Sequence, residues 1–242
     1  MELAPFHSKE QNPVTGTIIA EEASSLMRSV FTWMFVALGI TALTAWLFAN
    51  SGLVGLLYTE TGMSGLGWVV TLSPLAMVIA MSLGLNKMRT STLTLLFIIY
   101  AILMGMSLSY IFIFFTGSTI TKAFLVASGM FAAMAIAGYV TQMDLSRFGS
   151  ILFMALIGLI IASVVCAFTH STRAEWIISI LGVILFAGLT AWDVNSIRRM
   201  STYIEADSDM ARKMGVYCAL SLYLDFINLF LYLLRIFARS ND

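Results

Sequence analysis

GVYCALSLYLDFINLFLYLLRIF, residues 215–237, is an apolar run long enough to cross a bilayer as a helix, and it carries Asp225 near its middle. A carboxylate at that depth costs about 2.5–3.5 kcal/mol on insertion scales, so it should face protein or a wet cavity and have a partner. Steps of three and four residues place other polar or small side chains on the same helix face: Cys218, Ser221, Asn228 and Tyr232. The run is therefore predicted to turn a narrow polar stripe towards protein.

The composition of the whole chain is that of an integral membrane protein. Of its 242 residues, 60% are hydrophobic and only 11% are charged, against about 25% charged in a soluble domain. A net charge of zero argues against nucleic-acid binding through a basic patch. Cys166 and Cys218 lie in apolar runs and are expected to be buried small side chains. Neither His7 nor His170 has a partner at metal-ligand spacing.

Seven apolar runs are each close to the roughly 20 residues that a membrane helix needs. Their length, and the absence of two-residue alternation, indicate helices and not strands. The predicted fold class is an all-α seven-helix membrane bundle over residues 26–242, preceded by a polar cytoplasmic segment at residues 1–25. The spans are expected at about 27–49, 66–85, 91–115, 119–140, 149–168, 175–194 and 215–237.

The loop charges favour an N-terminus on the cytoplasmic side. The loops on that side would hold most of the basic residues: Lys9, Arg28, Lys87, Arg89, Arg147, Arg198, Arg199, Arg212 and Lys213. The other side would hold Lys122, Arg173, Arg235 and Arg239. A re-entrant last helix would make the bias stronger, but a run of about 23 residues is long for such an element, so a full span is predicted.

Small residues recur at every fourth position in two of the expected spans. Gly105 and Ser109 do so in the third span, and Gly129, Ala133 and Ala137 in the fourth. Such faces allow helices to make close contacts. Each pair could equally well be ordinary membrane-helix composition with no such contact.

A second acid, Asp193, lies at the end of the sixth run, in FAGLTAWDVNSIRRM (186–200), with Thr190 on its helix face. Alone, it fits an interfacial acid better than a site. Because consecutive spans can lie side by side, however, Asp193 and Asp225 could meet, and two close carboxylates in a low dielectric would share one proton. Such a pair would form a proton-sensitive latch, and its oxygens would suit Ca²⁺.

Other side chains could support or neutralise this pair. The supporting candidates are Ser221, Asn228 and Thr190, and the nearest basic residues in sequence are Arg198 and Arg199. Glu205, Asp207 and Asp209 form a more charged cluster in the following loop. It lacks the glycine turn and closing glutamate of an EF-hand, so a solvated loop is the better interpretation.

Three stretches resemble the Bax inhibitor family, also called the transmembrane Bax inhibitor motif family: LTAWDVNSIRRM (189–200), YLDFINLFLYLLR (223–235) and MDLSRFGSILFMALIGLIIASVV (143–165). The resemblance covers nearly the whole chain, and the loops are most similar to those of bacterial members. It implies a seven-helix bundle with the last helix at the centre, ringed by the other six. It also implies a pH-sensitive calcium leak in which two aspartates, by motif Asp193 and Asp225, sense protons. Some members latch the pair with a basic residue of the second helix. This chain has none within that span, and Lys87 and Arg89 come just past it.

The sequence therefore favours a calcium leak channel in a bacterial inner membrane, gated by Asp193 and Asp225. Its partners would be the bilayer, Ca²⁺, protons and other membrane proteins, with no cofactor. The alternative, from the same resemblance, is a regulatory or interaction protein that modulates cell death or a membrane protease without moving ions. An enzyme is not expected, because the Tyr-Asp and Gly-x-Gly-Asp motifs of intramembrane aspartyl proteases are replaced by Trp192-Asp193 and Leu224-Asp225.

Overall fold

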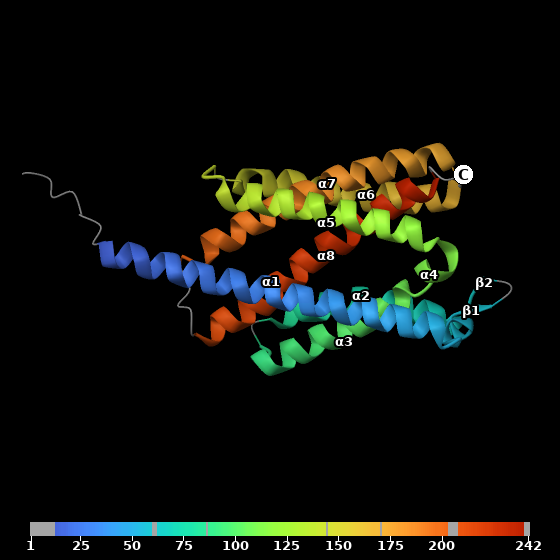
Figure 1. The fold of residues 1–242 in the computed structure, drawn as a ribbon, viewed down its shortest axis with the longest axis horizontal. Coiled ribbons are helices and arrows are strands. Elements are labelled where there is room, and N and C mark those ends of the chain that lie inside the picture. The colour runs from blue at the N-terminus through green and yellow to red at the C-terminus, as the bar shows by residue number, and fades with distance from the viewer. Residues whose placement is uncertain are drawn as a thin grey trace, which may run out of the picture.

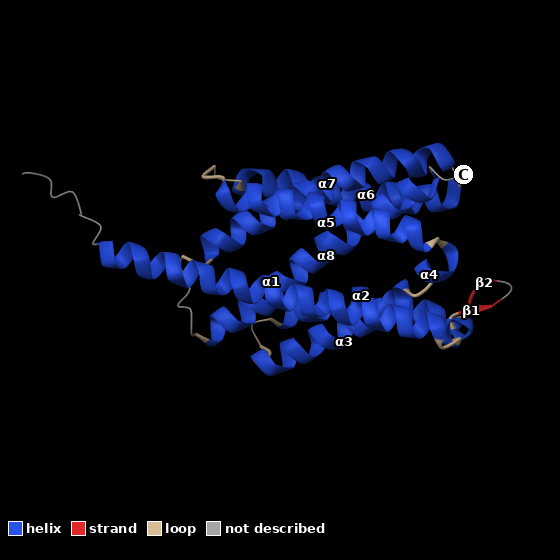
Figure 2. Cartoon of the chain, viewed as in Figure 1, coloured by secondary structure: helices blue, strands red, loops and turns tan. Residues whose placement is uncertain are grey.

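The computed structural model describes residues 13–59, 62–85, 87–143, 145–169, 171–202 and 208–239. Within them, seven helices are long and apolar enough to cross a membrane, which confirms the predicted fold class (Figure 1). The helices are α1 (Pro13–Asn50), α2 (Gly65–Gly84), α3 (Thr90–Leu108), the short α4 (Ile111–Phe114), α5 (Gly117–Val140), α6 (Ser146–Thr169), α7 (Thr172–Met200) and α8 (Asp209–Arg239). Figure 2 shows strand only in the two-residue β1 (Tyr58–Thr59) and β2 (Gly62–Met63), which follow the 3-10 helix η1 (Leu53–Leu56).

The last helix is the centre of the bundle. In Figure 1, α8 runs obliquely between a layer of α5, α6 and α7 and a layer of α1, α2 and α3. It packs mainly on α1, α3, α5 and α7, while α2 packs on α3 and α6 on α7. The central position implied by the family resemblance is confirmed, but the ring around α8 is made chiefly by four helices and not six.

Aromatic and hydroxyl groups tie α8 to the layer of α1 and α3. Tyr223 is fully buried, and its ring meets Phe97 and Tyr100 edge-on at centroid distances of 6.1 and 5.5 Å. Its hydroxyl lies 2.8 Å from Oγ1 of Thr41, which donates to the carbonyl of Ala101 at 3.0 Å. These bonds satisfy polar groups that have no water partner at this depth.

Several helices differ from the expected boundaries. The first helix begins at Pro13, before the expected start of the span at about 27, but its membrane-spanning part begins at Ser25, close to that expectation. The third expected span, about 91–115, agrees with the membrane span Thr90–Phe114, although the helix breaks locally at Ser109, where the hydroxyl donates to the carbonyl of Met106 at 2.7 Å and α4 begins. Both α7 and α8 extend past their apolar runs, because a helix can continue into the polar interface that hydropathy does not report.

The two small-residue faces have different outcomes. At Gly105 an added Cβ would lie 2.6 Å from the carbonyl oxygen of Thr41, so α1 and α3 are in close contact there. Gly129, Ala133 and Ala137 are exposed, so this face fits the alternative of ordinary membrane-helix composition and not a close contact within the described part of the chain. Helix α5 instead turns inward the face that carries Ala123, Ala127, Phe131, Ala135 and Gly138.

The two ends of the bundle differ in charge. The end where α7 finishes and α8 begins, here called the basic end, carries Arg28, Lys87, Arg89, Arg147, Arg198, Arg199, Arg212 and Lys213. The opposite end carries Lys122, Arg173, Arg235 and Arg239. Arg239, at the end of α8, donates to the carbonyl of Thr172 at the start of α7. Helix α8 therefore spans the full height of the bundle.

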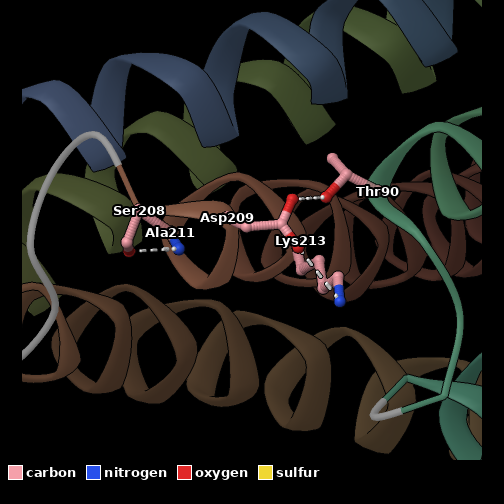
Figure 3. A network of polar contacts seen from close by, with 5 residues as sticks. All are labelled: Thr90, Ser208, Asp209, Ala211 and Lys213. Atoms are coloured by element: carbon pink, nitrogen blue, oxygen red, sulfur yellow. Dashed lines mark hydrogen bonds and ion pairs between the residues drawn. The ribbon is translucent and has the colours of Figure 1, made fainter.

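Polar contacts at the basic end join the first turns of α3 and α8 (Figure 3). Thr90 donates to Oδ1 of Asp209 at 2.6 Å, and Asp209 pairs with Lys213 at 3.2 Å. The backbone N–H of Ala211 donates to Oγ of Ser208 at 3.1 Å. Asp209 is thus held as the first residue of a helix whose positive dipole end favours an acid. Glu205 and Asp207, its predicted companions in the loop, lie outside the described residues, as do His7 and His170.

Candidate functional site in the bundle core

Asp193 of α7 and Asp225 of α8 lie together in the core of the bundle. Helices α7 and α8 form the most extensive helix pair of the structure, and both carboxyl groups point into that contact. Asp193 is 8% exposed and Asp225 is 5% exposed, and the two side chains are within hydrogen-bonding contact of each other. The meeting of these acids, which the sequence could only suggest, is present in the fold.

Hydrogen bonding around the two acids is unequal. Ser221, one turn before Asp225 on α8, donates its hydroxyl to Oδ2 of Asp193 at 2.5 Å. Oδ2 of Asp225 is buried and has no hydrogen-bond partner among the described residues. Two carboxylate oxygens in contact both accept, so the contact is favourable only when a proton lies between them. The geometry therefore suits a pair that holds one proton jointly.

Asp193 lies farther inside its helix than the hydropathy pattern suggested. Helix α7 continues for seven residues beyond it, to Met200, which is about 10 Å of helix. Asp225 lies near the midpoint of α8, between Asp209 and Arg239. The pair is thus located well within the bundle and not at its surface.

Arg198, one of the two expected basic neighbours, has other partners. Its guanidinium donates to the backbone carbonyls of Tyr139 and Thr141, where α5 ends, and lies 5.9 Å from the centroid of the Tyr139 ring. A cation there complements the negative end of the α5 dipole and its unpaired carbonyls. Arg199 follows in the last turn of α7. Arg198 thus acts as a cap for α5 and not as the counter-ion of the acids.

Two other candidate polar residues are satisfied within their own helices. Thr190 is fully buried and donates to the carbonyl of Phe186 at 2.8 Å. Asn228 is half-buried and donates to the carbonyl of Leu224 at 2.8 Å. Among the polar candidates, Ser221 is the residue whose hydroxyl donates to one of the acids.

Aromatic rings close the site on the side that faces the opposite end of the bundle. The rings of Phe186 and Tyr232 stack at a centroid distance of 5.9 Å. Gly182 makes room for them, because an added Cβ there would lie 2.6 Å from the Tyr232 ring. Beyond the stack is a cavity of about 840 Å³, whose lining includes Ser179, Glu175 and Arg235. Along α7 and α8, the stacked rings lie between the acids and the residues that line this cavity.

Asn195 is a structural residue that the sequence analysis did not identify. It is fully buried, two residues after Asp193, and its amide donates to the carbonyls of Gly138 at 3.1 Å and Thr141 at 3.3 Å. Its position in the polar segment WDVNS, two residues after Asp193, is the feature of the sequence that could have identified it. Asn195 fixes α7 against the end of α5 and so sets the position of Asp193.

The two acids offer few ligands for a tightly held metal ion. Within the described part of the chain, no three His, Cys, Asp or Glu side chains gather at metal-binding distance. Two carboxyl groups and the Ser221 hydroxyl are hard oxygen donors, but Ca²⁺ takes about six to eight oxygens. This set therefore offers fewer oxygens than a tightly bound Ca²⁺ requires.

Comparison with known proteins identifies the lineage of this chain. Residues 23–242 match the family model described as "Inhibitor of apoptosis-promoting Bax1". The inner membrane protein YbhL of Escherichia coli is 42% identical over 93% of this chain and 97% of its own length. Uncharacterized proteins of Borreliella burgdorferi and Rickettsia prowazekii are 40% and 38% identical over 90% and 89% of the chain and 94% and 90% of their own lengths. The chain is a multi-pass membrane protein that belongs to the Bax inhibitor family.

Proposed function

We propose that this protein is a Ca²⁺ leak pathway whose opening is set by protonation of the Asp193–Asp225 pair. The observation that carries the proposal is the contact of two buried carboxyl groups in the core of a membrane bundle, with a hydroxyl donor beside them and Arg198 bound elsewhere. Intramembrane acids are costly and usually mark ion or proton pathways. An acid pair held by one proton is a two-state element that responds to pH.

The arrangement described here corresponds to a closed state. The proton shared by the two acids holds α7 against α8, and the stacked rings of Phe186 and Tyr232 close the route to the cavity at the opposite end. Further protonation neutralises the pair and loosens its hold on the two helices. We therefore expect the leak to increase as pH falls.

The cavity at the opposite end provides an aqueous entrance to this route. Ser179, which lines it, lies on the α7 face that also carries Asp193, about 21 Å farther along the helix. Glu175 is the acid at the mouth, while Arg235 lies 5.5 Å from the Tyr232 ring and opposes cation entry in the closed arrangement. Movement of Tyr232 would carry Arg235 with it. The aromatic stack and the repulsive charge of Arg235 would then be removed together.

The same proposal gives the protein no catalytic residues and no resident cofactor. It places the chain in a bacterial inner membrane, as the name of the Escherichia coli relative suggests. The basic end would face the cytoplasm, because positive charge is retained on that side, and residues 1–12 would then be cytoplasmic.

Purified wild-type protein in liposomes that contain a Ca²⁺-sensitive dye tests the proposal. We expect Ca²⁺ entry that protein-free liposomes lack and that becomes faster as the pH is lowered between about pH 8 and pH 5. Absence of Ca²⁺ entry at every pH would contradict the proposal. It would favour the alternative function, a membrane regulator that acts through other proteins.

A further inference from the structure

A continuous apolar groove lies between α1 and α5, on the lipid-facing side of the bundle. It consists of three cavities of about 290, 720 and 260 Å³ that share lining residues. Phe31 and Ile136 belong to the first two, and Leu38 and Phe124 to the last two. From Met27 to Ala45 the lining covers about 27 Å of helix, close to the roughly 30 Å of a bilayer's hydrocarbon core.

The floor of this α1–α5 groove is the central helix. Phe226 of α8 lies under the groove, and its ring contacts Phe124 and Phe131 edge-on at centroid distances of 5.8 and 5.5 Å. The walls open outward, since Phe35 is 63% exposed and Ile136 is 64% exposed. An apolar channel of this kind within a bilayer fills with hydrocarbon, because water has no partners there.

Positive charge marks the mouth of the groove at the basic end. Arg28 lies three and seven residues before Phe31 and Phe35, on the helix face that lines the groove. Across the mouth, the guanidinium of Arg198 lies over the ring of Tyr139, which lines the first cavity. Basic pockets between membrane helices are typical sites for anionic lipid headgroups.

We propose that the α1–α5 groove binds one anionic glycerophospholipid from the surrounding bilayer. An acyl chain lies along Phe31, Leu38 and Phe124 and reaches Phe226, while the phosphate is held between Arg28 and Arg198. The acyl chain of the bound lipid thus contacts Phe226, which follows Asp225 in the chain. The proposal rests on the groove and its charges alone and is independent of Ca²⁺ transport.

A photoreactive phosphatidylglycerol, with the reactive group in its acyl chain, tests the proposal in liposomes that contain the full-length protein. We expect adducts concentrated on groove residues such as Phe124 and Ile136. Gly39 lines the groove and an added Cβ meets nothing within 4 Å, so Gly39→Leu should fill the groove, leave the fold intact and remove most of these adducts. Gly129→Leu is the matched control, because Gly129 is equally unobstructed but lies outside the groove, and it should keep them.

The headgroup is tested by comparison with a phosphatidylcholine of the same acyl chain. Wild type should favour the anionic lipid, and Arg28→Gln and Arg198→Gln should each reduce that preference by about fivefold. The groove would be overturned as a lipid site if the adducts were spread over the bundle in proportion to exposure. It would also be overturned if Gly39→Leu left the adducts unchanged. A groove that gives no adducts, as when a second copy of the chain covers it, would overturn it equally. Equal labelling by the two lipids would overturn the anionic headgroup site.

Discussion

Asp225→Asn is expected to abolish the pH dependence of the Ca²⁺ leak while the protein remains folded. Asparagine has nearly the same shape but cannot share a proton with Asp193, so the coupled titration that sets the arrangement of α7 and α8 would be lost. A leak controlled by one proton can change by up to about tenfold per pH unit, and that slope should fall to near zero in the variant. The measurement is the initial rate of Ca²⁺ entry into liposomes across the same pH range as for wild type.

Asp193→Asn should have the same effect, because the two acids titrate as one unit. The double variant should be no flatter than either single variant, since groups that act together are not additive. Asp209→Asn is the matched control: it removes an exposed acid from the same helix, α8, and should leave the pH profile unchanged. If the rate of Ca²⁺ entry depended on pH in both Asp193→Asn and Asp225→Asn as it does in wild type, the pair would be excluded as the pH sensor.

Gly138→Ala should be the most destabilising of the small substitutions in the membrane core. An added Cβ would overlap the carbonyl oxygen of Ala191 and lie 2.9 Å from its Cα, and these main-chain atoms cannot rotate away. Separation of α5 from α7 would also stretch the bonds from Asn195 to Gly138 and Thr141. Overpacking of this kind typically costs about 1–3 kcal/mol, and the lost amide bonds would add to it.

The thermal unfolding midpoint of the purified protein in detergent measures this effect. Gly129→Ala is the control on the same helix: an added Cβ there meets nothing within 4 Å, and alanine favours the helix over glycine by up to about 1 kcal/mol. We expect a marked decrease for Gly138→Ala and no change or a small increase for Gly129→Ala. Equal shifts would mean that α5 and α7 are not in backbone contact at Gly138.

The number of spans could be predicted from the sequence because the bilayer imposes strict limits on what crosses it. Without water, each span must be a long apolar helix, and an acid such as Asp225 must face protein. The polar stripe of the last helix therefore indicated that this face is turned towards protein, and the family resemblance implied the central position. The helix ends could not be read in the same way: α7 continues from Asp193 to Met200 through interface residues that carry no hydropathy signal.

The partners of individual side chains could not be predicted from the sequence. Small residues serve equally well against lipid and against another helix, so the spacing of Gly129, Ala133 and Ala137 did not reveal that they are exposed. Arg198 lies near Asp193 in sequence, but the carbonyls left unpaired where α5 ends attract its guanidinium. The α1–α5 groove arises from two helices far apart in the chain, and neither run alone indicates it.

Infrared difference spectroscopy can show directly whether Asp193 and Asp225 hold one proton between them. As pH is lowered, wild-type protein should gain a protonated-carboxyl band that the double variant Asp193→Asn/Asp225→Asn lacks, in addition to the absorption of the exposed acids that both proteins share. We expect a single such difference band, assigned to the pair. No band in wild type, or an identical band in the double variant, would contradict it.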